Sequence, residues 1–408
     1  MPDPDSPGGQ EPSGGQEPPG GQEPPEDQEL PGIQPAGTPQ PGPPSRPRRV
    51  GRVLWSGAPW PGSPALTRRG LTLLVAGFGV IAALVVAATL PVPYVALTPG
   101  PTLNTLGELS GRPLIQISGH PTYKTSGHLN MVTVSFIGGP QSNFNIFAAL
   151  RSWLMPDNAV VPEEEIFTPG QTQQQVLQQD TEEMTSSQQL ATAAALCQLG
   201  VRFKTVDTIQ STEKGKPAYG VLHKGDGITA VDGTPVTCRH DAAAMIRNRK
   251  PGAQVTLTVS RHGASRTFRL GTADVSGTPV VGVAVGESFV FPFKVKISIG
   301  NIGGPSAGMM FALGIIDKLT NDNLTGGKFI AGTGEIEVNG KVDPIGGIQQ
   351  KMAGARAAGA TVFLTPAANC PDTSGAVPAG LRLVKVSTLG GAVRDLNAIK
   401  QGKPVPSC

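Results

Sequence analysis

The sequence lacks the residue patterns of several common kinds of functional site. No stretch has the form GxxxxGKS or GxxxxGKT, so this chain carries no P-loop for nucleotide phosphates. Its four cysteines fit no zinc-binding spacing, and its five histidines are scattered without the pattern of a Ser–His pair. We therefore expect no metal site, no cofactor and no nucleotide-hydrolysing motor of the chain's own.

The first 47 residues contain no aromatic residue and little that a core could bury. Three copies of GGQEP repeat every six residues from Gly8 to Pro24, and the whole chain has 54 glycines and 40 prolines. This composition predicts disorder. A proline-rich ligand for a cytoplasmic partner is the alternative, although no aromatic or basic anchor accompanies the prolines.

One apolar run is long enough to cross a membrane. The twenty residues from Leu71 to Leu90 are uncharged, which predicts a spanning helix over 70–91. Six arginines precede the run: Arg46, Arg48, Arg49, Arg52, Arg68 and Arg69. By the positive-inside rule, residues 1–69 are a cytoplasmic tail and the chain beyond Pro91 lies outside the cytoplasm.

Two alternatives bear on this anchor. The basic patch could bind nucleic acid, but its position beside an apolar run favours lipid head groups, so we expect membrane lipid and no nucleic acid as partner. A cleaved signal peptide is the competing interpretation of the run, although the region before it is far longer than a usual n-region.

All four cysteines, Cys197, Cys238, Cys370 and Cys408, lie on the side predicted to be extracytoplasmic, where disulfides persist. Four cysteines allow three complete pairings. The pairing of Cys370 with Cys408, which would tie down the C-terminal tail, is the one we favour.

The most informative stretch begins at Gly303. Gly303-Gly304-Pro305-Ser306 precedes an apolar run with three- and four-residue spacing, which predicts a loop followed by a helix with Ser306 in its first turn. A serine there lies beside unpaired backbone N–H groups. It can simply cap the helix or, with a substrate present, help to hold a developing oxyanion.

A lysine lies 45 residues further on, in a second predicted helix. Asn339-Gly340 predicts a hairpin, and the residues from Pro344 to Gly347 begin the helix that carries Lys351 among apolar neighbours. Such surroundings disfavour the ammonium form, lower the pKa of a lysine and let it act as a general base, whereas a surface lysine stays charged. Serine activated by lysine is a known nucleophile–base pair.

These residues resemble the Lon-type serine peptidases. The resemblance rests on GGPSAG at 303–308, TGEI at 333–336 and GKVDPIGGIQQKMAGARAAGA ending at residue 360. It implies that Ser306 is the nucleophile, that Lys351 is its base and that Thr333 hydrogen-bonds near the lysine. Many members carry an acidic residue three positions before the nucleophile. Here Gly303 stands there, so that charge is absent, and Gly303 and Gly304 are the supporting loop residues.

The strand–loop–helix–strand succession around these motifs predicts an α+β domain, and the resemblance implies that residues 273–408 form a Lon-type proteolytic domain. Residues 92–200 are predicted to be an extracytoplasmic part of the same region, with a strand at 129–136, helices at 143–154 and 182–199, and a polar loop at 161–179. GHLNMVTVSF and EEMTSSQQLATAAA are similar to the first strand and first helix of the family. This implies a peptidase fold that begins near residue 95 and is interrupted.

The interruption, residues 201–272, resembles a bacterial PDZ domain, inserted into or preceding the proteolytic domain. KPAYGVLHKGDGITAVDGTPV is followed by a predicted helix at 240–249 and a hairpin. The resemblance implies that a peptide adds a strand to a sheet edge while its carboxylate meets backbone N–H groups. Leu199-Gly200-Val201 has the apolar-Gly-apolar pattern of such a carboxylate loop. A small β domain acting as a spacer is the alternative.

Together these features predict a membrane-anchored, extracytoplasmic serine endopeptidase that uses a Ser306–Lys351 dyad, with protein or peptide substrates recognised or gated by the PDZ domain. ATP should be dispensable, and substrates should be unfolded, flexible or already cleaved. The resemblance also implies a homo-oligomer, because Lon peptidases form rings. A catalytically silent PDZ adaptor and a purely structural cell-envelope anchor are the alternatives from other classes.

Overall fold

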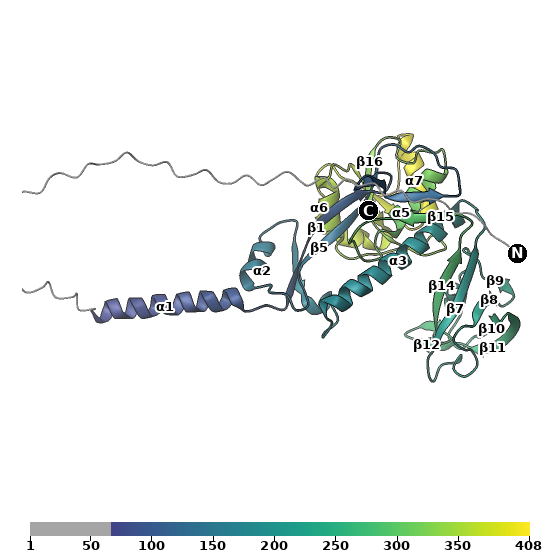
Figure 1. Ribbon diagram of the computed structural model, residues 1–408, viewed down its shortest axis with the longest axis horizontal. Helices are drawn as coiled ribbons and strands as arrows, with labels where there is room; N and C mark the ends of the chain where they lie inside the picture. The colour runs from purple at the N-terminus through teal and green to yellow at the C-terminus, as the bar shows by residue number, and fades with distance from the viewer. Residues whose placement is uncertain (1–66) are drawn as a thin grey trace, which may run out of the picture. The chain divides into compact units, whose positions relative to one another are not determined.

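The computed structural model describes residues 67–408, and these form a mixed α/β protein (Figure 1). The predictions for the tail before Thr67, including those for the arginines at 46–52, lie outside the described residues.

The first element is α1 (Arg68–Thr89), which contains most of the apolar run predicted to cross a membrane. Its 22 residues are about 33 Å long at 1.5 Å per residue, close to the thickness of a bilayer's hydrocarbon core. None of its residues is buried, and Thr67 caps its N-terminus by accepting a hydrogen bond from the Gly70 N–H. The helix is long and apolar enough to span a membrane.

A mixed six-stranded sheet, here called the central sheet, is built from segments far apart in the chain. Its strands in spatial order are β20 (Arg382–Val386), β19 (Val362–Pro366), β16 (Phe329–Gly332), β5 (His128–Gly138), β1 (Tyr94–Asn104) and β6 (Ala159–Pro162). β1 pairs antiparallel with β5 and β6, and the other neighbours pair in parallel. Since three strands precede residue 200 and three follow residue 328, the sheet is built from two separate parts of the chain.

Helices cover both faces of this sheet, because alternate residues of its strands point to opposite sides. Ile330 packs into a core with α3 (Gln173–Gln198), α5 (Gly308–Leu319) and α7 (Leu389–Lys400), whereas Ala331 packs into a second core with α6 (Ile348–Ala357). The helix after Ser306 and the helix that carries Lys351 therefore lie on opposite faces, with β16 between them.

A second sheet and one helix form a unit with its own hydrophobic core. Its members are β11 (Ala264–Gly271), β10 (Gln254–Arg261), β8 (Gly227–Val231), β7 (Lys204–Thr212) and β14 (Val283–Val290), with β9 (Thr234–Pro235) paired to β8 and α4 (Ala242–Arg247) beside them. β14 pairs along all of its eight residues with β7. The unit therefore extends beyond residue 272, the predicted end of the PDZ domain.

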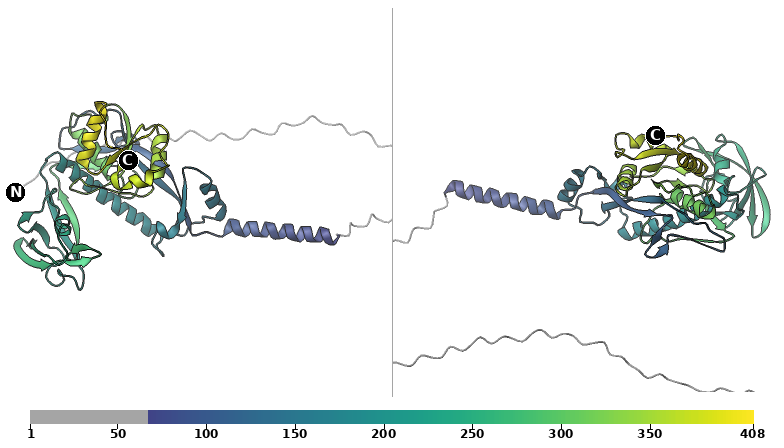
Figure 2. Two further views of the ribbon diagram at one scale, coloured as in Figure 1. Left: turned by 180° about the vertical axis from the view of Figure 1, so that it is seen from behind. Right: turned by 90° about the horizontal axis from the view of Figure 1, so that it is seen from above.

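The remaining elements are short. They are α2 (Ile146–Trp153), which lies beside the end of α1 in every view (Figures 1 and 2), the 3₁₀ helices η1 (Glu163–Glu165) and η2 (Ala367–Thr373), and the strand pairs β2 (Glu108–Leu109) with β3 (Arg112–Pro113), β4 (Ile115–Ser118) with β15 (Lys294–Ile297), β12 (Ala273–Val275) with β13 (Thr278–Val280), and β17 (Glu335–Ile336) with β18 (Val342–Asp343).

The polar loop predicted at 161–179 is wrong, because α3 already begins at Gln173. Its first turns are largely exposed and rich in glutamine, so they lack the apolar period by which a helix is recognised. The signal that was present is a capping box, in which Thr172 and Gln175 each accept a hydrogen bond from the other's backbone N–H.

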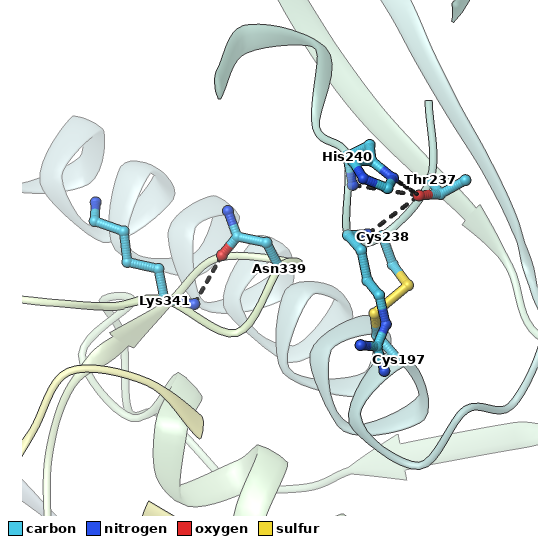
Figure 3. The surroundings of a disulfide bond; sticks show 7 residues. Cys197, Thr237, Cys238, His240, Asn339 and Lys341 are labelled. Atoms are coloured by element: carbon cyan, nitrogen blue, oxygen red, sulfur yellow. Dashed lines mark hydrogen bonds between the residues drawn. A yellow bond between two sulfur atoms is a disulfide. The ribbon is translucent and has the colours of Figure 1, made fainter. Parts of the chain in front are cut away.

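Two disulfides join the cysteines in pairs, Cys370 with Cys408 as favoured and Cys197 with Cys238. Cys197 lies at the C-terminal end of α3, and Cys238 lies in the loop before α4, beside Thr237 and His240 (Figure 3). This second disulfide therefore links a helix of the central-sheet core covalently to the second-sheet unit.

Candidate active site

Ser306 lies in the loop before α5, not in the helix. The prediction that it occupies the first turn is wrong, since α5 begins at Gly308 and Ala307 is the capping residue. Gly304 has φ +83° and the Gly308 N–H donates to the Pro305 oxygen, so the chain turns once more before the helix starts. No side chain caps this helix, which means that the Ser306 hydroxyl is not a helix cap.

Helix α3 holds the serine loop in place. The Gly304 N–H donates to the Asp180 carbonyl oxygen at 3.0 Å, and the Ser187 hydroxyl donates to the Pro305 oxygen at 2.9 Å. A Cβ atom on Gly303 would lie 2.4 Å from the Asp180 Cβ, so only glycine fits there. The resemblance would place an acidic side chain at position 303. The side chain of Asp180 lies next to this position instead.

Lys351 lies on α6, which packs on the opposite face of the central sheet from α5. The helix starts after Gly347, whose φ is +66° and where a Cβ would lie 2.7 Å from the Val134 side chain. Glycine lets the helix begin against β5, and Lys351, on its second turn, is only 3% exposed. Its helix neighbours Ile348 and Met352 are buried too, so the apolar setting predicted for the lysine is present.

The lysine and serine side chains meet directly. Lys351 Nζ lies 2.9 Å from Ser306 Oγ and 3.3 Å from Thr333 Oγ1. The Thr333 hydroxyl donates to the Ser306 carbonyl oxygen at 2.9 Å, and the Gly334 N–H donates to the same oxygen at 2.8 Å. The segment that follows β16 therefore ties the serine backbone to the position of the lysine.

Burial lowers the pKa of Lys351 to about 7, and the nearby Glu335 carboxylate opposes this by favouring the charged amine. Near neutral pH a large fraction of the side chain is then a neutral amine. Such an amine has a lone pair that can accept the proton of a hydroxyl 2.9 Å away.

The dyad opens into a cleft with acidic and apolar walls. Three carboxyl groups line it, those of Asp180, Glu183 and Glu335, and Lys351 is the one basic residue among its lining residues in the described chain. Burial raises the pKa of Asp180 and of Glu335. Its apolar lining includes Leu97, Met131, Val134, Phe136, Ile166 and Met184. The cleft can therefore accommodate an extended peptide beside the serine.

The structure does not bring Leu199, Gly200 and Val201 to a peptide groove. They follow directly on α3, and Leu199 and Val201 pack against the central-sheet core. The second-sheet unit instead has an apolar groove between α4 and residues 279–285. This stretch contains Val281-Gly282-Val283, a second apolar-Gly-apolar pattern that sequence reasoning overlooked, at the start of the edge strand β14.

Comparisons with known proteins agree with this geometry. Residues 295–393 match the family model of the Lon protease (S16) C-terminal proteolytic domain, and residues 197–272 match that of the PDZ domain. The chain thus contains a region similar to the proteolytic domain of Lon proteases and a region similar to PDZ domains.

The relatives extend far beyond the matched region. The chain is 46% identical over 69 residues to the Lon protease of Roseiflexus castenholzii, covering 17% of this chain and 8% of that protein. It is 38% identical over 96 residues to the Lon protease of Heliobacterium modesticaldum, covering 22% and 11%. It thus spans about a tenth of these curated relatives. A solved PDZ domain of the SdrC-like protein Lin2157 from Listeria innocua is 28% identical and covers 20% of this chain and 92% of that one, with a TM-score of 0.19.

Proposed function

We propose that this chain is a membrane-anchored serine endopeptidase in which Ser306 is the nucleophile and Lys351 its general base. The observation that carries the proposal is the 2.9 Å contact between the two side chains, with the lysine buried at the foot of an open cleft. A hydroxyl and an amine placed in this way form the nucleophile–base pair of a serine–lysine hydrolase.

The reaction follows from the positions of the two groups. The neutral amine of Lys351 takes the proton of Ser306 Oγ as that oxygen attacks the peptide carbonyl carbon. The lysine then gives the proton to the leaving amine, and the C–N bond breaks to leave an acyl ester on Ser306. Water attacks the ester with the lysine again as base, which releases the acid product and restores the serine.

The oxyanion needs backbone N–H groups near Ser306 that are not already bonded within the protein. The Gly304 N–H is not one of them, because it donates to the Asp180 carbonyl oxygen. In the described chain, the N–H groups of Ser306 and Ala307 make no hydrogen bond to protein. We assign these two, at the N-terminus of α5, to the negative oxygen of the tetrahedral intermediate.

The proposed location is the outer face of a membrane, with the N-terminus in the cytoplasm. An uncharged stretch within α1, the arginines before it and two disulfides after it support this arrangement. Since the chain has no P-loop, cleavage of unfolded or flexible substrates should need no ATP. By analogy with Lon rings, we also propose a homo-oligomer.

For the PDZ domain we propose peptide capture at the groove between α4 and β14. β14 ends its sheet, so one edge is open to a further strand, and Val281-Gly282-Val283 replaces Leu199-Gly200-Val201 as the carboxylate loop. Ala243 lines the groove, and Ala244 on the same helix does not. Ala243→Glu should weaken binding of a peptide with a free carboxylate, and Ala244→Glu should not. Equal weakening by both would contradict this assignment.

Catalysis is tested by supplying the purified full chain with casein and no nucleotide, beside Ser306→Ala and Lys351→Ala. Fragments from the parent alone support the endopeptidase. Equal fragments from all three proteins would place the activity elsewhere. If all three bind unfolded protein but none cleaves it, the chain is the PDZ adaptor that the groove alone would support.

A further inference from the structure

Helix α2 presents an apolar face to its surroundings. Its two buried residues are the small Ala149 and Ser152, whereas its large side chains and that of the capping residue after it are 44–69% exposed: Ile146, Phe147, Leu150, Trp153 and the cap Leu154. At 100° per residue these five lie within about 120° of the helix circumference, opposite the buried side. A contiguous apolar face of this kind is a binding surface rather than ordinary solvent-exposed surface.

The position of this face relative to α1 indicates what covers it. Asn145, which caps α2, donates from its side-chain amide to the Ala88 carbonyl oxygen in the last turn of α1 at 2.9 Å. The Val92 N–H, just after α1, donates to the Phe144 oxygen at 2.8 Å. α2 therefore begins where α1 ends, and the views in Figures 1 and 2 show α2 next to the end of α1.

We propose that α2 lies in the boundary between head groups and acyl chains of the leaflet at which α1 ends, with its apolar face toward lipid. This rests on the proposed membrane anchor. Helices of this kind bury an apolar face at the interface and keep charge at the margin. Arg151, the one charged residue of α2, lies just beside the apolar arc, where it meets head groups, and the amphipathic ring of Trp153 suits the same depth.

Lipid is favoured over a second protein copy because the apolar face continues directly from a helix that is itself apolar all round. α2 is also fixed to the central sheet, since Phe144 and Ala149 form a small core with Ala96 of β1. The catalytic domain would thus rest on the bilayer through two adjacent helices rather than hang from one linker.

The test uses the full chain in vesicles of phosphatidylcholine and phosphatidylglycerol with bromine at defined acyl depths. Trp55 and Trp60, the other two tryptophans, are changed to Phe so that Trp153 alone reports. A matched protein carries Trp153→Phe and Phe78→Trp, which places its one probe in the middle of α1, where Phe78 is exposed. The depth at which each tryptophan loses most emission is then measured.

We expect the probe at position 78 to lose most emission to bromine deep in the acyl chains and Trp153 to lose most to bromine near the head groups. If the deep probe behaves so while Trp153 is quenched only by aqueous iodide, α2 faces water and the inference is overturned. Shielding of Trp153 from both quenchers means that protein covers it, which also overturns the inference. Failure of the deep probe overturns the membrane anchor itself, and the two proposals are thereby distinguished.

Discussion

The pH dependence of cleavage should report the state of Lys351. An ordinary lysine, with a pKa of 10.5, is neutral in about one molecule of three thousand at pH 7. With the pKa lowered to about 7, half of the molecules hold the neutral base, a gain of more than a thousandfold. At 1.36 kcal/mol per pKa unit, the net effect of burial and the opposing Glu335 carboxylate disfavours the charged amine by about 5 kcal/mol.

The perturbation that tests this is Glu335→Gln. The Glu335 carboxylate raises the lysine pKa against the larger effect of burial, so its removal should move the midpoint of the rate profile to lower pH. Glu183→Gln is the matched control. It removes another carboxylate from the same cleft, but Glu183 is not among the groups that shift the pKa of Lys351.

The assay is kcat/KM for a fluorogenic peptide from about pH 5 to about pH 9, where folding of each variant is checked by circular dichroism. The rate should rise through a single ionisation near neutral pH and then level off. A flat profile of the parent, or a midpoint that Glu335→Gln leaves unchanged or raises, would show that Lys351 is not the titrating base.

Two further predictions concern the groups that hold the dyad. Thr333→Val removes the hydroxyl that contacts both Lys351 Nζ and the Ser306 carbonyl, and kcat should fall roughly tenfold with KM little changed. Thr365→Val is the control, because in residues 67–408 its buried hydroxyl has no hydrogen-bond partner. It should leave kcat unchanged and raise the free energy of unfolding by about 1 kcal/mol. Gly303→Ala should lower kcat/KM at least tenfold by pushing the loop away from Asp180, and Asp180→Gly in the same protein should restore part of the loss. A Thr333→Val enzyme of full activity, or a Gly303→Ala enzyme of full activity, would show that these contacts do not position the serine.

Local patterns in the sequence predicted much of the fold around Ser306 and Lys351. The Asn-Gly hairpin, the Pro-Ile-Gly-Gly helix start and the apolar neighbours of Lys351 are properties of consecutive residues, and each has its counterpart between β17 and α6. Helix α1 could also be predicted from its apolar run, because the prediction of such a helix needs only length and composition.

What the sequence did not disclose depends on contacts between distant segments. Glycine is required at position 303 because the Asp180 side chain lies against it. Asp180 belongs to α3, whose polar first half lacks the apolar periodicity by which a helix is predicted from sequence. The placement of Val281-Gly282-Val283 rather than Leu199-Gly200-Val201 at the groove depends on β14 pairing with β7. The two apolar-Gly-apolar patterns fit a carboxylate loop equally well in sequence, and only the strand pairing shows which of them lies at the groove.

Covalent labelling of Ser306 shows whether a buried neutral lysine activates this serine. The full chain is treated with a fluorophosphonate at several pH values and the adduct is located by mass spectrometry. We expect one adduct, on Ser306, that forms faster as pH rises through about 7 and is nearly absent in Lys351→Met. Labelling of another residue, or equal labelling of Ser306 when Lys351 is methionine, would contradict it.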